Sequence, residues 1–443
     1  KKVVKIVEAL ERQKIVKVPD PENKGKFIEK EEDDPDWATA KSILTELLNN
    51  RAEMKSYDRS VMWNYWGYLY FSDEDYDQAM YAYEQLLKEP EATVPLRTAS
   101  LLTLAQLNLV KERWDKGIDL ILQWMDEVET VTAQSYYLLA SAYFQKTDYV
   151  RARSNMEEAI RLAEEEGYRP KENWYVLLAA CFSELKDKKI ISAQFALEQQ
   201  VGIYEILVNY YPKKMYFLQL GGTYQQMDRE EDYMLTLKAA FDKDLLDKEG
   251  EYLALAQLLL IKKNPYWAAQ VLVAGQDKKV TIKDEDTGEE EIVAVVKDKE
   301  KTLKLLADAW RMAQEIDMAI PVLEKAAKMS KDGDTYVLLG NLYLFEDRME
   351  DSIRAIEAGL KKSKVKSRSQ ALLVLGQAHF ELQNFEEAKK QFRAAARDEN
   401  KRIKKTANSW IKYAENEEVR VKNLALRRDF IQQSQAKSKE KNS

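Results

Sequence analysis

The stretch WNYWGYLY at residues 63–70, followed by Ala79 and Tyr83, decides the fold. Trp63, Trp66 and Gly67 are three and four residues apart, which sets them on one face of a helix. Ala79 and Tyr83 are four residues apart and share one face of a second helix. The arrangement returns along the chain about every 35 residues, which indicates an array of helical repeats. The small residue at position 8 of the unit marks nine copies: Gly67, Ala105, Ala140, Ala179, Gly221, Ala256, Ala307, Gly340 and Gly376.

The spacing has a physical reason. Positions 4, 7, 8 and 11 fall on one face of a first helix, and positions 20, 24 and 27 fall on one face of a second. Gly67 and Ala79, at positions 8 and 20, remove side-chain bulk where the two helices cross. Neither helix can cover its apolar stripe alone, so each hairpin is expected to stack on the next one.

This pattern resembles the tetratricopeptide repeat over most of the chain. The resemblance implies an all-α fold, a right-handed superhelical solenoid of helical hairpins with a concave inner wall. Gly117 and Tyr233 stand at position 20, where alanine is expected. These two repeats therefore depart from the pattern.

Three segments are expected along one continuous array. Residues 1–50 form a degenerate hairpin, with helices at 2–13 and 37–49 and an inserted acidic loop at 19–36. Residues 51–400 carry about nine repeats. Residues 401–443 form a capping helix over 401–417, which covers the open end of the array, and a basic, flexible tail.

Two further interruptions break the repeat phase. The fourth full repeat is longer than the others, and a second helix over residues 190–211, ended by Pro212, would absorb the additional residues. Between residues 276 and 300, β-branched residues flank the sequence DEDTG at 284–288. This composition predicts a small β-hairpin near 280–296 that interrupts the helices.

Composition restricts the class of ligand. The net charge is −7, and 33% of the residues are charged, with the basic runs gathered toward the C-terminal end. These basic runs are interpreted as a solvated face, and nucleic acid is not expected as a partner. The sequence contains no apolar run of the length that crosses a bilayer.

Residues for catalysis or metal binding are scarce. Cys181 and His379 are the one cysteine and the one histidine, and no phosphate-binding or nucleophile motif is present. Cys181 is predicted to be a buried small residue, and His379 to pack between helices with one ring nitrogen bonded. Asp284, Asp286 and Gly288 favour a turn over a calcium loop. No enzyme activity, cofactor or metal is expected.

The inner wall of such an array is the expected binding surface. First-helix positions 2, 5, 9, 12 and 13 face the groove, and their amide and aromatic side chains suit an extended peptide. Residues at position 12, and some at position 5, either line the groove or pack on the neighbouring repeat. The candidates are Asn64, Tyr68, Phe71, Gln106, Tyr137, Ser141, Phe144, Gln225, Gln257, Asn341, Phe345, Gln377 and Phe380.

A narrower resemblance concerns the partner. Residues 171–174, 210–220, 255–266 and 319–333 resemble tetratricopeptide proteins encoded beside the TonB, ExbB and ExbD components of Gram-negative bacteria. This resemblance implies a periplasmic adaptor for outer-membrane uptake, and a first residue other than Met is compatible with a removed leader. The departure of residues 19–36 and 276–300 from that pattern leaves the partner's identity open.

Other functions remain open. The chain departs from the repeats that bind chaperone tails, because Lys304 is followed by Asp308, and Asn64 by Tyr68. One alternative is a cytoplasmic assembly factor, and another is a regulatory subunit that positions a separate enzyme. The oligomeric state is not predicted.

Overall fold

The computed structural model describes residues 2–19, 27–283, 290–362 and 364–441. The described chain is almost entirely helical, and it divides into two compact units, Lys1–Met227 and Asp228–Ser443. The sequence suggested one continuous array. The division falls in the repeat that has Tyr233 at the position of the small residue. A solenoid has contacts between neighbours in place of one shared core, so its repeats can separate into such groups.

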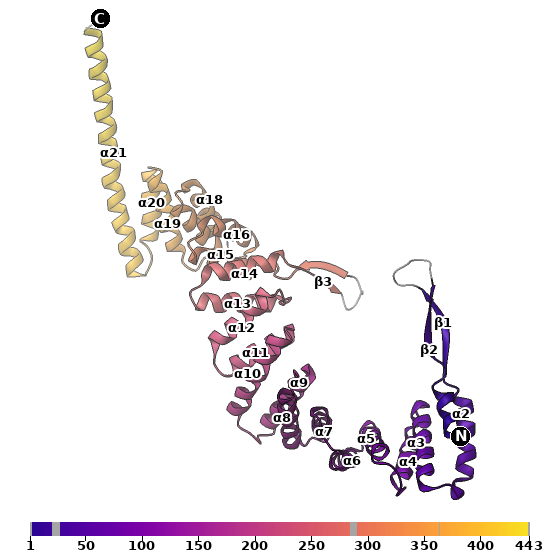
Figure 1. Ribbon diagram of the computed structural model, residues 1–443. Coiled ribbons are helices and arrows are strands. Elements are labelled where there is room, and N and C mark those ends of the chain that lie inside the picture. The colour runs from indigo at the N-terminus through magenta and orange to yellow at the C-terminus, as the bar shows by residue number, and fades with distance from the viewer. Residues whose placement is uncertain (1, 20–26, 284–289, 363, 442–443) are drawn as a thin grey trace. The chain divides into compact units, whose positions relative to one another are not determined.

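The first unit is a series of antiparallel helices with a β-hairpin between the first two, α1 and α2 (Figure 1). Its elements in chain order are α1 (Lys2–Leu10), β1 (Gln13–Pro19), β2 (Phe27–Asp33), α2 (Trp37–Asn49), a short 3-10 helix (Arg51–Glu53), α3 (Ser56–Ser72), α4 (Tyr76–Leu87), α5 (Val94–Val110), α6 (Trp114–Glu127), α7 (Ala133–Gln145), α8 (Tyr149–Glu165), α9 (Glu172–Asp187), α10 (Ala193–Tyr210) and α11 (Lys214–Gln226).

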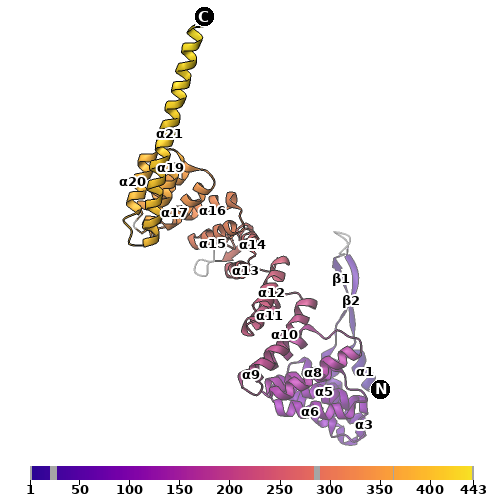
Figure 2. The same ribbon diagram turned by 90° about the vertical axis from the view of Figure 1, so that its left-hand side faces the viewer.

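The second unit continues the helical series and ends in a long helix that extends past α19 and α20 (Figure 2). Its elements are α12 (Glu230–Asp242), α13 (Glu249–Ile261), α14 (Pro265–Asp277), β3 (Lys279–Lys283), β4 (Glu290–Ala294), α15 (Glu300–Met312), α16 (Ile316–Met329), α17 (Asp334–Phe345), α18 (Met349–Leu360), α19 (Arg368–Glu381), α20 (Phe385–Ala395) and α21 (Lys401–Lys441). The all-α fold class with a small β-hairpin insertion is confirmed.

The predicted helix crossings are present at the small residues. A Cβ atom on Gly67 would lie 2.6 Å from the Tyr83 ring, and one on Gly376 would lie 2.5 Å from the Phe392 ring. In both hairpins a position 8 glycine on the first helix therefore meets a position 24 ring on the second. Such a contact leaves no space for a larger side chain.

The turn inside each hairpin has a recurring backbone conformation. In eight of the nine repeats the residue seven positions after the small residue adopts a positive φ, as at Glu74 (φ 60°) and Gln383 (φ 60°). In the longer fourth repeat it is Lys189 (φ 57°), ten positions after Ala179. After α3, the Glu74 amide donates to the Phe71 carbonyl, and the next amide donates to the Tyr70 carbonyl. This is the hydrogen-bond pattern of a Schellman turn, made here without the usual glycine.

The N-terminal segment differs from the expectation. The first helix ends at Leu10, not at residue 13, and part of the expected loop 19–36 is strand β2. β2 pairs antiparallel with β1, in a register that sets Ile15 opposite Glu31. The β-branched residues at 15, 16 and 18 favour a strand over a helix. The second helix begins at Trp37 as predicted, where the Asp36 side chain accepts a hydrogen bond from the Thr39 amide.

The second β-hairpin lies where the sequence predicts it. β3 and β4 pair antiparallel, with Val280 opposite Val293. The expected turn at 284–288 lies outside the described residues. Val295 and Val296 are not part of the strands. They are buried, and their amides donate to Lys278 and Gly275, which attaches the hairpin to α14.

Two helix boundaries also differ. The long second helix of the fourth repeat begins at Ala193, not at residue 190, because the Ser192 hydroxyl caps it by accepting from the Phe195 amide. The C-terminal helix does not end at residue 417. α21 runs through Lys441 without a proline or glycine to end it.

Candidate functional site

A pocket in the first unit brings together two of the predicted groove residues. Its volume is about 290 Å³, and α1, α3 and α4 form its walls. Asn64 and Tyr68 lie on α3 at positions 5 and 9 of the repeat, and both line the pocket. The complete lining is Val7, Leu10, Glu11, Asn64, Tyr65, Tyr68 and Tyr83.

The polar groups of this pocket are mostly neutral. Burial raises the pKa of Tyr83 to about 12, and burial also raises the pKa of Tyr65. Both phenols therefore keep their protons at neutral pH and can donate hydrogen bonds. Glu11 is the acidic residue of the lining. Rings, hydroxyls and one amide together suit a peptide backbone with an apolar side chain.

Tyr68 is held from one side and free on the other. Its ring lies 6.0 Å from that of Trp37 on α2, at an interplanar angle of 31°. The residue is nevertheless 47% exposed. A large aromatic side chain that is oriented by a neighbour and still exposed offers contact area at little cost in conformational entropy.

Three predicted residues at position 12 pack within their own hairpins. The rings of Phe71 and Tyr76 lie 5.9 Å apart, and those of Phe144 and Tyr149 lie 5.2 Å apart. Phe380 is only 8% exposed and lies between Phe385 and the rings of α21. For Phe380 the structure therefore agrees with the packing alternative, because α21 covers this side of the last hairpin.

The other candidates of the first unit are not gathered in the pocket. The Tyr137 ring stacks on Trp174 at 5.5 Å, and its hydroxyl accepts a hydrogen bond of 2.8 Å from Asn173 on α9. Ser141 is half-buried on the same helix, α7. Gln106 on α5 and Gln225 on α11 are exposed.

The candidates of the second unit lie on separate first helices. Gln257 on α13 is exposed, and Gln377 on α19 is half-buried. The Asn341 amide donates to the Val337 carbonyl of its own helix at 2.9 Å. Phe345, at the end of α17, is 70% exposed. None of these four residues lines a described pocket of the second unit.

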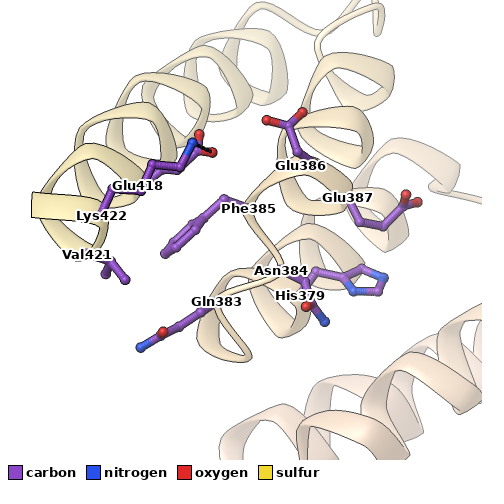
Figure 3. Close-up of a pocket in the computed structure, with 9 residues that line it drawn as sticks. All are labelled: His379, Gln383, Asn384, Phe385, Glu386, Glu387, Glu418, Val421 and Lys422. Carbon is purple, nitrogen blue, oxygen red and sulfur yellow. Dashed lines mark hydrogen bonds and ion pairs between the residues drawn. The ribbon is translucent and has the colours of Figure 1, made fainter. Parts of the chain in front are cut away.

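A second pocket, of about 570 Å³, lies between α20 and α21 (Figure 3). Phe385 points from the start of α20 toward α21, whereas the imidazole of His379 points away from α21. Beside the pocket, the Lys389 ammonium lies 2.6 Å from both Glu386 and Glu418. Lys422 lies 2.7 Å from Glu418. The Lys389–Glu418 pair joins the two helices.

The one cysteine and the one histidine lie on different helices, α9 and α19. Burial raises the pKa of the Cys181 thiol to about 12, which confirms its prediction as a buried small residue. His379 is half-buried, its pKa is lowered by burial, and its Nδ1 has no hydrogen-bond partner in the described part of the chain. The described residues contain no cluster of His, Cys, Asp and Glu that fits a metal ion. None of their helices is long and apolar enough to cross a membrane.

The pocket around Asn64 and Tyr68 contains residues that the sequence did not indicate. Tyr83 was assigned to packing as the large residue of its repeat, and Tyr65 was given no role. Val7, Leu10 and Glu11 belong to the N-terminal segment, which lacks the repeat pattern. No sequence signal marked the residues of this segment, because their place over α3 depends on tertiary packing.

Comparison with known proteins identifies the repeat. Models of the tetratricopeptide repeat match residues 133–166 and 337–401. No curated protein matches the chain. Among solved structures, MamA is 19% identical over 42% of this chain and 92% of that one, with a TM-score of 0.34. YrrB, described as a tetratricopeptide protein with an unusual peptide-binding site, is 16% identical over 45% of this chain and 91% of its own, with a TM-score of 0.32.

A longer overlap occurs with the Cut9–Hcn1 complex of the anaphase-promoting complex. That chain is 13% identical over 86% of this chain and 81% of its own, with a TM-score of 0.28. The family models place tetratricopeptide repeats in both units, since residues 133–166 span α7 and α8 and residues 337–401 span α17 to α20.

Proposed function

We propose that this protein is a non-enzymatic scaffold that binds a peptide or a partner subunit through the inner faces of its helical hairpins. The supporting observation is the pocket around Asn64 and Tyr68, two residues selected from repeat spacing that line one cavity. Its neutral donors and exposed ring suit an extended chain. The remaining groove candidates, from Phe71 to Gln377, would add contacts along neighbouring first helices.

The partner we propose is a component of a TonB-type uptake system, and the compartment is the periplasm. This part rests on the sequence resemblance to proteins encoded beside TonB, ExbB and ExbD. A cytoplasmic assembly factor, or a subunit that positions a separate enzyme, is the alternative. The purified chain and the purified periplasmic part of TonB allow a direct measurement, and absence of binding at micromolar concentration would remove TonB itself as the partner.

Photo-crosslinking in the native host tests the pocket. A photoreactive phenylalanine in place of Tyr68 should capture a partner, and Asn64→Ala in the same chain should reduce the yield about tenfold. Tyr81 on α4 is the matched control, because it is 51% exposed, close to the 47% of Tyr68. Equal capture of the same protein from residues 68 and 81 would contradict the proposal.

A further inference from the structure

The first four turns of α21 carry basic side chains that pair with no carboxylate in the described part of the chain. Residues 401–414 include Lys401, Arg402, Lys404, Lys405 and Lys412 and no acidic residue. Lys401, Lys404, Lys405 and Lys412 are exposed and form no ion pair within 4.0 Å with any residue that the structure describes. These four lysines are referred to below as the lysine face.

The surrounding basic residues of the second unit behave differently. Lys389 and Lys390 on α20 are paired with Glu386 and Glu387, and Arg420 on α21 is paired with Glu417. Carboxylates are therefore abundant near α21, but none of those described reaches the lysine face. In a chain of net charge −7, the lysine face is therefore a local positive patch.

The lysine face occupies the place that ligand-facing residues have in the repeats. Ala407 is fully buried at the position of the small residue, so α21 packs as a further first helix. Counted from Ala407, Lys401, Lys404 and Lys412 fall at positions 2, 5 and 13. In α3 the equivalent position 5 is Asn64, which lines the neutral pocket.

Two open depressions, both lined by α21 alone, follow this surface. One, of about 430 Å³, is lined by all four lysines together with Asn408 and Ser409. The other, of about 380 Å³, shares Lys405 and Ser409 with the first and reaches Trp410 and Tyr413. Charged and aromatic surfaces are thus continuous along one helix.

The aromatic part is rigid. The Trp410 ring stacks on Phe392 at 5.5 Å, and the Tyr413 ring lies 5.1 Å from Phe380. Tyr413 is still 53% exposed. Its ring can therefore receive an apolar side chain without losing conformational freedom in the process.

From these observations we infer that the lysine face binds an extended protein segment that carries several acidic side chains and one apolar residue. The inference rests on the proposed scaffold function and gives the chemistry of one ligand. Lys401 and Lys412 are separated by about 16 Å along the helix axis, at about 1.5 Å per residue. An extended chain covers that distance with about five residues.

Charge distribution favours a protein segment over a nucleic acid or an anionic bilayer. Those ligands extend beyond the lysine face and would meet the exposed carboxylates of Glu386 and Glu415.

Calorimetry with the full chain tests the inference. The probe is a six-residue peptide of four glutamates, one phenylalanine and one glycine, blocked by an acetyl and an amide group. Binding is expected at 50 mM salt and should weaken about tenfold at 300 mM salt. A peptide with glutamines in place of the glutamates should bind at least tenfold more weakly.

The matched variants change net charge equally. Lys404→Glu with Lys412→Glu should abolish binding, whereas Lys331→Glu with Lys361→Glu, at exposed positions elsewhere in the second unit, should leave it intact. Equal effects of the two pairs would overturn the inference. So would absence of binding to the wild-type chain, or tighter binding of a 20-nucleotide single-stranded DNA or of phosphatidylglycerol vesicles. Crosslinking from residue 68 that persists in such a case would leave the proposed scaffold function standing.

Discussion

The first and last complete repeats of the described chain share one type of helix crossing, but the helices that cover them carry different side chains. Gly67 meets Tyr83 in α3 and α4, and Gly376 meets Phe392 in α19 and α20. Over the first hairpin, α1 leaves a pocket of neutral phenols. Over the last, α21 is attached by aromatic rings and by ion pairs around Lys389, and its unpaired lysines remain exposed.

This difference shows that separate parts of the sequence determine the helix crossing and the chemistry of the exposed surface. The repeat determines how helices cross, and it does so with the same residue types in both units. The segments that close the terminal hairpins are not repeats, and they determine which charges and rings a ligand meets. Ligand chemistry in this protein is therefore expected to be concentrated in α1 and α21 and in the first-helix residues beside them.

The largest expected effect comes from breaking the shared crossing. Gly67→Trp and Gly376→Trp should each lower the free energy of unfolding of their own unit by about 3 kcal/mol or more, because the new side chain overlaps a buried ring. Urea unfolding followed by circular dichroism measures this. Gly202→Trp on α10 is the control, since no atom lies within 4 Å of a Cβ there. Equal stability of all three variants would contradict the assigned crossing.

The crossing could be predicted because it is local. Gly376 and Phe392 are separated by a fixed number of residues within one hairpin, and helical periodicity alone sets them face to face. The same holds for α2, whose start is marked by Asp36. The β-hairpin near 280–296 was visible for a similar reason, since its β-branched arms flank a turn sequence.

What could not be predicted depends on contacts between distant residues. The strand at Gln13–Pro19 was missed because its lysines interrupt the apolar pattern, and pairing with β2 decides its state. Phe380 has the sequence position of a groove residue, yet α21 covers it. The lysine face was interpreted as a solvated surface, because sequence shows which residues are basic and does not show which of them find a carboxylate.

An intermediate effect concerns the attachment of α21. Hydrogen bonds from Lys389 and Lys422 lower the pKa of Glu418 to about 2, below its value of about 4.3 in an unfolded chain. A lowered pKa adds stability that is fully present above about pH 4.3 and is lost as the pH falls toward 2. Hydrogen exchange of residues 401–421 should therefore accelerate between pH 4.3 and pH 2, relative to α3 in the first unit.

The variant Glu418→Gln tests the contribution of this ion pair to the attachment of α21. It should show faster exchange of α21 already at neutral pH and a flatter profile in acid. Glu415→Gln is the control, because Glu415 is exposed and makes only a long contact of 3.9 Å with Arg393. If Glu418→Gln and the wild-type chain lose protection in parallel, the ion pairs around Lys389 do not hold α21.

The smallest expected effect concerns the turn that the two hairpins share. Glu74 and Gln383 both adopt φ 60°, a conformation that strains any residue with a Cβ atom. Glu74→Gly and Gln383→Gly should each raise the free energy of unfolding by about 0.5 kcal/mol, because relief of strain exceeds the entropy that glycine adds to the unfolded chain. The opposite substitution can be made at Gly167, which has φ 77° and no atom within 4 Å of an added Cβ. Gly167→Ala should lower stability by about 1 kcal/mol through backbone strain alone. A loss of stability in both glycine variants would show that the polar side chains stabilise these turns by more than the strain costs.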